Sequence, residues 1–275
     1  MKKENIHWRL LINSPHDGIW NMALDESILE TVARKEVLPT LRLYAWNPYC
    51  LSLGQAQSIL DVDQQRLNNN NWGIVRRPTG GKAILHADEL TYSICLPQSD
   101  PLVSGTVVES YRRLSTALLL ALQNMGIKAD SKPKSDEDRK KIPNPVCFEV
   151  PSDYEITYHE KKLIGSAQAR RAKGVLQHGA IPLFGNITRI TNVLKFQDET
   201  QRQETASKLF ERATTIQSIL NRTISWQEIA DAVIEGFEKT LNIYFSDSKL
   251  SVMELKRAED LVRNKYGNKE WTYKQ

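Results

Sequence analysis

The chain has 275 residues, of which 40% are hydrophobic and 25% charged, as in an ordinary globular protein that folds as one large domain. Its net charge of +4 suits an acidic protein partner, but it is too small, and the basic residues too scattered, to indicate nucleic-acid binding. Because no run of about 18 apolar residues occurs and the first eight residues lack the apolar core of a signal peptide, we expect a cytoplasmic protein without a transmembrane helix.

The first seventy residues alternate between apolar runs and turn-forming residues. Apolar residues recur along residues 19–35 at helical spacing, with Leu24, Ile28 and Val32 on one face, so we expect a helix there. The other elements expected in this part are a strand at 8–12, a loop at 13–18, a hairpin of residues 41–46 and 50–53 around Asn47-Pro48, and a short helix at 61–70.

The stretch from Gly73 to Cys95 is the centre of the sequence. Residues 73–75 predict a strand that runs into Arg76 and Arg77, and a turn with paired glycines follows. Residues 83–85 and 90–95 predict further strands. The turn suits a carbonyl or anionic group that lies against the backbone, but a plain β-hairpin with a glycine turn is equally compatible. A Walker A loop is excluded, because Ala83 follows Lys82 where that motif needs serine or threonine.

The second half begins with the clearest helix, residues 107–125, which opens with capping-box spacing from Thr106 to Glu109. Residues 130–145 are polar, charged and rich in proline, and predict a mobile surface loop. Strands are expected at 153–158, 161–168 and 175–181. The remainder is predicted to be mainly helical, with a second capping box from Ser225 to Glu228 and a closing helix at 252–266.

The three cysteines, Cys50, Cys95 and Cys147, argue against a disulfide framework and a zinc site, because their number is odd and no Cys-x-x-Cys spacing occurs. Cys50 and Cys95 fall in apolar runs and are expected in the core. Cys147 follows the polar loop and is a candidate nucleophile, although a lone cysteine is more often structural.

Lys162 leads into Gly165-Ser166-Ala167, where glycine lets a ligand approach, so it is a candidate for binding an acyl oxygen or a phosphate. A solvated lysine on a hairpin is the more common alternative. His86 and His178 are each a possible general base, or a structural histidine.

Four separated motifs together resemble one family. They are Arg76-Arg77-Pro78-Thr79-Gly80-Gly81-Lys82 through His86 to Ser93, Lys162-Leu163-Ile164-Gly165-Ser166-Ala167-Gln168, Gln177-His178-Gly179, and Asn21-Met22-Ala23-Leu24-Asp25-Glu26. They are similar to the catalytic domain of lipoate–protein and biotin–protein ligases. Within that superfamily, Val146-Cys147-Phe148 before Pro151-Ser152-Asp153-Tyr154-Glu155 resembles the octanoyltransferases of the LipM type.

The resemblance implies an α+β fold with a mixed, largely antiparallel sheet flanked by helices. It implies one catalytic domain over 1–275, whose last part, about 222–275, is a helical extension packed on it. It also implies a catalytic pair, Cys147 and Lys162, and no cofactor or metal. The substrate-binding residues that it implies are Arg76, Arg77, Thr79, Gly80, Gly81, His86, Gly165, Ser166, Ala167, His178 and Gly179.

The reaction implied by the resemblance is transfer of octanoyl from acyl carrier protein, through a cysteine thioester, to a lysine of a lipoyl domain such as glycine cleavage H protein. We expect a monomer that binds neither nucleic acid nor a membrane. The alternatives are an ATP-dependent lipoate or octanoate ligase, an octanoyl amidotransferase between lipoyl domains, and a non-catalytic acyl-binding or carrier-binding protein. Ligases of this family tend to have a third glycine where this chain has Lys82, which weakens the case for adenylate binding.

Overall fold

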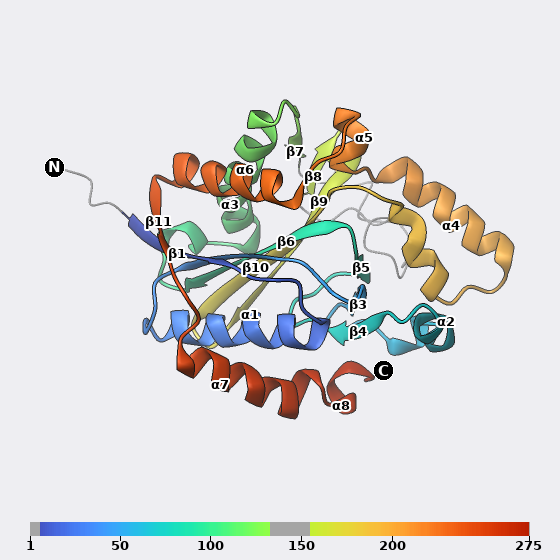
Figure 1. Cartoon of the computed structure of the whole chain (residues 1–275), viewed down its shortest axis with the longest axis horizontal. Helices are drawn as coiled ribbons and strands as arrows, with labels where there is room; N and C mark the ends of the chain where they lie inside the picture. Colours follow the sequence, from blue (N-terminus) through green and yellow to red (C-terminus); the bar gives the residue numbers. More distant parts are fainter. Residues whose placement is uncertain (1–5, 133–154, 275) are drawn as a thin grey trace.

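The structure, a computed structural model, describes residues 6–132 and 155–274. Its main sheet contains β1 (Ile6–Ile12), β2 (Thr40–Tyr44), β6 (Glu89–Pro97), β7 (Asp130–Lys132), β8 (Glu155–Tyr158), β9 (Lys161–Arg171), β10 (Gly174–Pro182) and β11 (Ile243–Asp247). The strand order is β11-β1-β2-β6-β10-β9-β8-β7 (Figure 1). β1 is parallel to both neighbours and the other neighbouring pairs are antiparallel. The predicted mixed, largely antiparallel sheet is confirmed.

Helices cover both faces of this sheet. α3 (Val107–Asn124) and α6 (Trp226–Leu241) lie on one face, while α1 (Gly18–Ala33) lies on the other and is covered by α7 (Val252–Leu261) (Figure 1). Because α1 is enclosed between the sheet and α7, its buried residues extend beyond the predicted apolar face and include Asn21 and Asp25. Two apolar cores result, one on each side of the sheet.

A second, three-stranded sheet has β3 (Cys50–Leu53) at its centre, parallel to β4 (Gly73–Arg76) and antiparallel to β5 (Ile84–His86). The expected hairpin around Asn47-Pro48 is therefore wrong, and so is the alternative of a plain hairpin at the glycine turn. β2 and β3, on either side of Asn47-Pro48, join different sheets, and β4 and β5, on either side of the paired glycines, lie on opposite edges of β3. The two strands were predicted, but every residue of β2 and β3 is buried. Because neither strand has an exposed face, its sequence pattern does not indicate which strands it pairs with.

The remaining helices agree only partly with expectation. The capping box at Thr106 and Glu109 is present. Ser225 caps α6 by accepting from the amide of Glu228, but the Glu228 carboxylate pairs with Arg222 and does not complete the box. β11 was not predicted, and the expected helix at 252–266 divides into α7 and a π-helical turn. The other α-helices are α2 (Gln64–Asn69), α4 (Glu199–Arg212), α5 (Ile216–Leu220) and α8 (Lys269–Thr272).

Within the two described ranges, no helix combines the length and the apolar composition that crossing a bilayer requires. Nor, in the same residues, does any group of three or more histidine, cysteine, aspartate or glutamate side chains have an arrangement that would hold a metal ion.

Candidate active site

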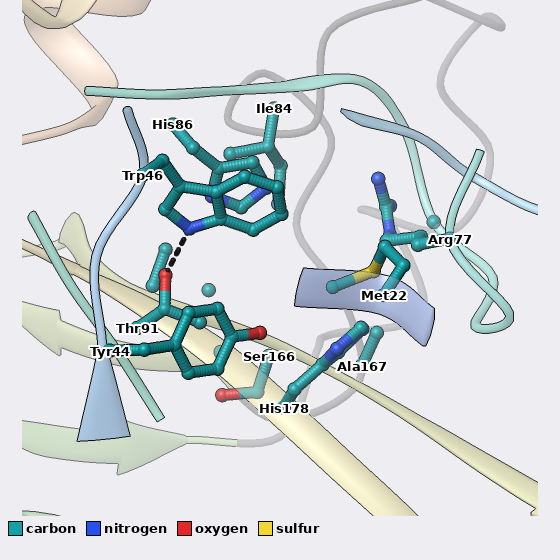
Figure 2. Close-up of a pocket in the computed structure, with 14 residues that line it drawn as sticks. Met22, Tyr44, Trp46, Arg77, Ile84, His86, Thr91, Ser166, Ala167 and His178 are labelled. Atoms are coloured by element: carbon teal, nitrogen blue, oxygen red, sulfur yellow. Dashed lines mark hydrogen bonds between the residues drawn. The ribbon is translucent and has the colours of Figure 1, made fainter. Parts of the chain in front are cut away.

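A cavity lies between α1, the main sheet and the glycine turn that joins β4 to β5. Figure 2 shows side chains from all three parts pointing toward it. The residues that line it are Met22, Tyr44, Trp46, Arg77, Gly81, Ile84, His86, Thr91, Gly165, Ser166, Ala167, His178, Gly179 and Ala180.

The glycine turn is held in place by Arg77, which comes directly after β4. Its Nη2 donates to the carbonyls of Gly80 at 2.9 Å and Lys82 at 2.7 Å, and its Nη1 donates to the carbonyl of Ser52 at 3.0 Å. Gly81 has φ +93°, in the left-handed region that favours glycine. The guanidinium therefore folds the turn back onto β3, and one face of the turn closes the cavity.

His86 and Trp46 form the second wall. Their rings stack with centroids 3.9 Å apart and planes at 10° (Figure 2). His86 Nδ1 is 2.6 Å from Glu89 Oε1, and its Nε2 is 2.8 Å from Ser52 Oγ. Trp46 Nε1 donates to Thr91 Oγ1 at 2.7 Å. Both ring nitrogens of His86 have partners, so this histidine is a fixed wall of the cavity.

His178 forms the third wall, where β10 faces α1. Its Nε2 is 2.7 Å from Thr79 Oγ1 and its Nδ1 is 3.4 Å from Asp25 Oδ2. Burial lowers the pKa of His178, and the nearby Asp25 carboxylate only partly opposes this, so the imidazole is neutral at pH 7. Burial by itself would raise the pKa of Asp25, but Arg42 and His178 together hold it below its usual value. Asp25 is therefore an ionised carboxylate beneath the cavity.

Polar groups in the cavity wall make bonds within the protein. Besides the bonds of Trp46, His86 and His178, the Ser166 hydroxyl is 2.6 Å from the hydroxyl of Tyr92, and Tyr44 donates to Asp25 at 2.8 Å. A ligand in the cavity meets ring faces, methyl groups and backbone. Since burying a polar group without a partner is unfavourable, this wall favours an aliphatic chain.

Lys162 owes its orientation to a β-bulge. Ile156 of β8 pairs with Ile164 of β9, but Thr157 pairs with Lys162, so β9 has one extra residue between the two pairs. Because neighbouring residues of β8 face opposite sides of the sheet, Lys162 and Ile164 also face opposite sides. The bulge therefore directs Lys162 to the face on which Ala167 lines the cavity.

Lys162 is 2% exposed and its Nζ donates to Glu155 Oε1 at 2.5 Å. A buried ammonium requires a counter-charge, and Glu155 supplies one. Lys162 does not line the cavity itself, but it lies farther along the same face of β9 than Gly165, which does. Glu155 was not among the predicted site residues, although a carboxylate at the start of the strand that pairs with β9 was a signal for it.

The structure brings many of the predicted site residues together. Those that line the cavity are Arg77, Gly81, His86, Gly165, Ser166, Ala167, His178 and Gly179. Thr79 does not line the cavity but is hydrogen-bonded to His178, which does. Gly80 lies in the turn without lining the cavity. Cys147, the predicted nucleophile, lies outside the described residues.

Arg76 does not line the cavity, because its guanidinium binds backbone carbonyls from two distant segments. It donates to Gly54, Gln55 and Gln57 after β3, and to Trp271, Thr272 and Lys274 near the C-terminus. This places Arg76 as a link between the glycine turn and the end of the chain.

The lining residues that were not predicted are Met22, Tyr44, Trp46, Ile84, Thr91 and Ala180. Asp25 was quoted within a motif but given no role; an acidic residue beside the apolar positions of a helix was the available signal. Trp46 carried no such signal, because an aromatic residue at the end of a strand is usually part of the core.

The family model described as the lipoyl protein ligase A/B catalytic domain matches residues 17–238. Octanoyltransferase LipM of Exiguobacterium sp. is 39% identical over 272 residues, which are 97% of this chain and 98% of that protein. Octanoyltransferase LipM of Bacillus subtilis is 35% identical over 279 residues, with 100% of both chains covered.

Among solved structures, the fold matches a bi-partite lipoate protein ligase from Thermoplasma acidophilum, studied with its E2 lipoyl domain as part of a lipoylation system. The TM-score is 0.80 and the identity 26%, over 98% of this chain and 96% of that one. The predicted similarity to a lipoate ligase catalytic domain is thereby confirmed.

Proposed function

This chain belongs to the lipoyl protein ligase A/B catalytic domain family and to its LipM octanoyltransferases, and on that premise we propose that it transfers an octanoyl group to a lysine of a lipoyl domain in lipoate biosynthesis. The donor we propose is octanoyl-acyl carrier protein, and the acceptor is a protein such as glycine cleavage H protein. The observation that carries the proposal is a cavity with a mainly apolar surface in a chain that resembles LipM octanoyltransferases over nearly its whole length.

The cavity supports this substrate class by its chemistry. Polar side chains in its wall make hydrogen bonds within the protein, so an eight-carbon chain would bury its methylene groups against Met22, Ile84 and the ring of Trp46. Each buried methylene contributes about 0.8 kcal/mol to the free energy of binding, so burial of the hydrocarbon is the main source of affinity for the octanoyl group.

The proposed reaction has two steps. The Cys147 thiolate attacks the carbonyl carbon of the donor thioester, a new C–S bond forms as the bond to the carrier sulfur breaks, and the carrier leaves as a thiolate. The neutral amine of the acceptor lysine then attacks the same carbon, and a C–N bond forms as the C–S bond to Cys147 breaks. Cys147 leaves as a thiolate, and the proton lost by the amine nitrogen passes to the carrier thiolate. The first step exchanges one thioester for another, and the amide product makes the second step favourable.

In this scheme the Lys162 ammonium stabilises the negative charge that develops on the carbonyl oxygen. Its burial and its hydrogen bond to Glu155 support the role, because both limit how far the ammonium can move. Because the thioester is already activated, the route uses no ATP and no metal.

An ATP-dependent ligase is the second candidate, favoured by the match to the Thermoplasma acidophilum ligase. A ligase would adenylate free octanoate or lipoate and would not need Cys147. Lys82, in place of the third glycine that such ligases tend to have, argues against it.

The experiment that tests the proposal is intact mass spectrometry after mixing the protein with octanoyl-acyl carrier protein in the absence of ATP. We expect a mass gain of one octanoyl group, removed by hydroxylamine as a thioester would be and lost in Cys147→Ala. Cys95→Ala is the matched control, because burial raises the pKa of the Cys95 thiol well above its usual value and the adduct should persist.

If no adduct forms, two further experiments separate the alternatives. Replacing octanoyl-acyl carrier protein with an octanoylated lipoyl domain as the donor tests whether the protein is an amidotransferase. Transfer from free octanoate that requires ATP and magnesium and survives Cys147→Ala would establish the ligase and overturn the proposal.

A further inference from the structure

Asp25 of α1 is a buried carboxylate on which side chains from three strands converge beneath the cavity. Its Oδ1 accepts from Arg42 Nη1 at 2.7 Å and from Ser93 Oγ at 2.8 Å. Its Oδ2 accepts from the Tyr44 hydroxyl at 2.8 Å and faces His178 Nδ1 at 3.4 Å. The donors come from β2, β6 and β10, and Asp25 itself from α1. The residue is 0% exposed, so water does not replace any of these donors.

This arrangement determines where the protons of His178 lie. An ionised carboxylate only accepts hydrogen bonds, so the ring nitrogen that faces Asp25, Nδ1, carries the hydrogen. The ring is neutral, so Nε2 has a free lone pair and can only accept. The hydroxyl of Thr79, 2.7 Å from Nε2, must therefore be the donor. Asp25, His178 and Thr79 form one directed chain of hydrogen bonds.

This series of hydrogen bonds ends at the turn that closes the cavity. Thr79 precedes Gly80 and Gly81, and Gly81 lines the cavity. Arg77 ties this turn to the small sheet, whereas the bond from Thr79 to His178 ties it to β10 of the main sheet. In Figure 2 His178 and Ala167 lie on one side of the cavity and Arg77 on another. The bond to His178 therefore fixes how far the turn stands from the opposite wall.

We propose that Asp25 is a positioning residue for the acyl chain: it selects the His178 form protonated at Nδ1, which makes His178 the acceptor for Thr79 and so sets the width of the cavity. The inference rests on the proposed function for the identity of the ligand, but not for the chain of hydrogen bonds. Its consequence is that selectivity among acyl chains depends on a carboxylate that does not touch them.

The first test measures the tautomer by NMR. The protein has five histidines, so the long-range ¹H–¹⁵N signals of His178 are assigned by their loss in His178→Gln. We expect a protonated Nδ1 and an unprotonated Nε2. Thr79→Val should shift the Nε2 resonance and leave Nδ1 protonated. A signal showing a proton on Nε2 in the wild-type protein would overturn the inference, whether or not the protein transfers octanoyl groups.

The second test measures selectivity with octanoyl- and decanoyl-acyl carrier protein. We expect Thr79→Val to raise KM for the octanoyl donor about 3–10-fold, as for loss of one neutral hydrogen bond, with little change in kcat, and to reduce the preference for octanoyl over decanoyl. Thr79→Ser keeps the donor and should recover most of the affinity. An unchanged KM and chain-length ratio in Thr79→Val would refute the positioning role.

Two controls separate this effect from others. Thr191→Val removes a buried hydroxyl that donates to Thr188 outside the cavity, and should lower stability without changing the chain-length ratio. Asp25→Asn leaves Arg42 without its counter-charge and can fail to fold, so Thr79→Val carries the test at the other end of the chain. If the wild-type protein transfers no octanoyl group, the proposed function fails, and binding of free octanoate and decanoate to wild type and Thr79→Val decides the inference instead.

Discussion

Gly54, directly after β3, makes the closest approach to the glycine turn. A Cβ at this position would lie 1.9 Å from the carbonyl oxygen of Gly81, a backbone atom, whereas such atoms do not approach within 3.0 Å. In Gly54→Ala the two segments must therefore separate by at least the difference, 3.0 − 1.9 = 1.1 Å. The displaced residue, Gly81, lines the cavity.

The turn cannot move freely by this distance. Arg77 holds the carbonyls on either side of Gly81, and the amide of Gln55 donates to the carbonyl of Thr79 at 2.9 Å. We therefore expect Gly54→Ala to lower the free energy of unfolding by about 1–3 kcal/mol, the usual effect of overpacking. For a chain of this size each kcal/mol corresponds to roughly 2–4 °C in Tm. Affinity for the octanoyl donor should fall as well.

Gly80→Ala is the matched control in the same turn. No atom lies within 4 Å of a Cβ at this position, and its φ is not in the left-handed region, so the free energy of unfolding should stay within about 0.5 kcal/mol of wild type. Urea denaturation of the two variants compares them directly, with KM for the octanoyl donor as a second measurement. If Gly54→Ala is as stable as Gly80→Ala, the close approach of residues 54 and 81 is refuted.

Two further predictions concern buried charge. Glu155→Gln removes a counter-charge from buried Lys162 and should lower the free energy of unfolding by about 1.5–3 kcal/mol, as for a hydrogen bond to a charged group; an unchanged urea midpoint would contradict this. The pKa of His178 is lowered from 6.5 in the folded state, so below pH 6.5 the unfolded chain binds a proton that the folded protein does not. The contribution of His178 to the free energy of unfolding should therefore be fully present above pH 6.5 and decrease as the pH falls toward the folded pKa, by at most about 1.4 kcal/mol per pH unit. Urea denaturation at several pH values checks this: the free energy of unfolding should depend less on pH in His178→Gln than in the wild-type protein.

Much of the candidate site was accessible from the sequence, because its motifs are contiguous. The glycine turn beginning at Arg76 and the strands that contain Gly165 and His178 could each be identified from their residues, and most of the substrate-binding residues expected there do line one cavity. The strand and helix patterns also predicted α3 and its capping box, since amphipathic spacing and capping depend on residues only three or four positions apart.

The sequence alone therefore determined most of the strands and helices, the glycine turn and several polar residues around the cavity, but not β7, which falls in the stretch expected to be a loop, nor β11. Only the tertiary structure decided which strands pair, on which face Lys162 lies, and that Asp25 meets His178, 153 residues away, and Arg76 meets Trp271, 195 residues away. The physical reason is that the local periodicity of apolar residues indicates whether a residue is buried, but not which residues bury it. Partners distant in sequence are selected by the packing of the whole sheet, and a one-residue bulge reverses the face on which a side chain lies.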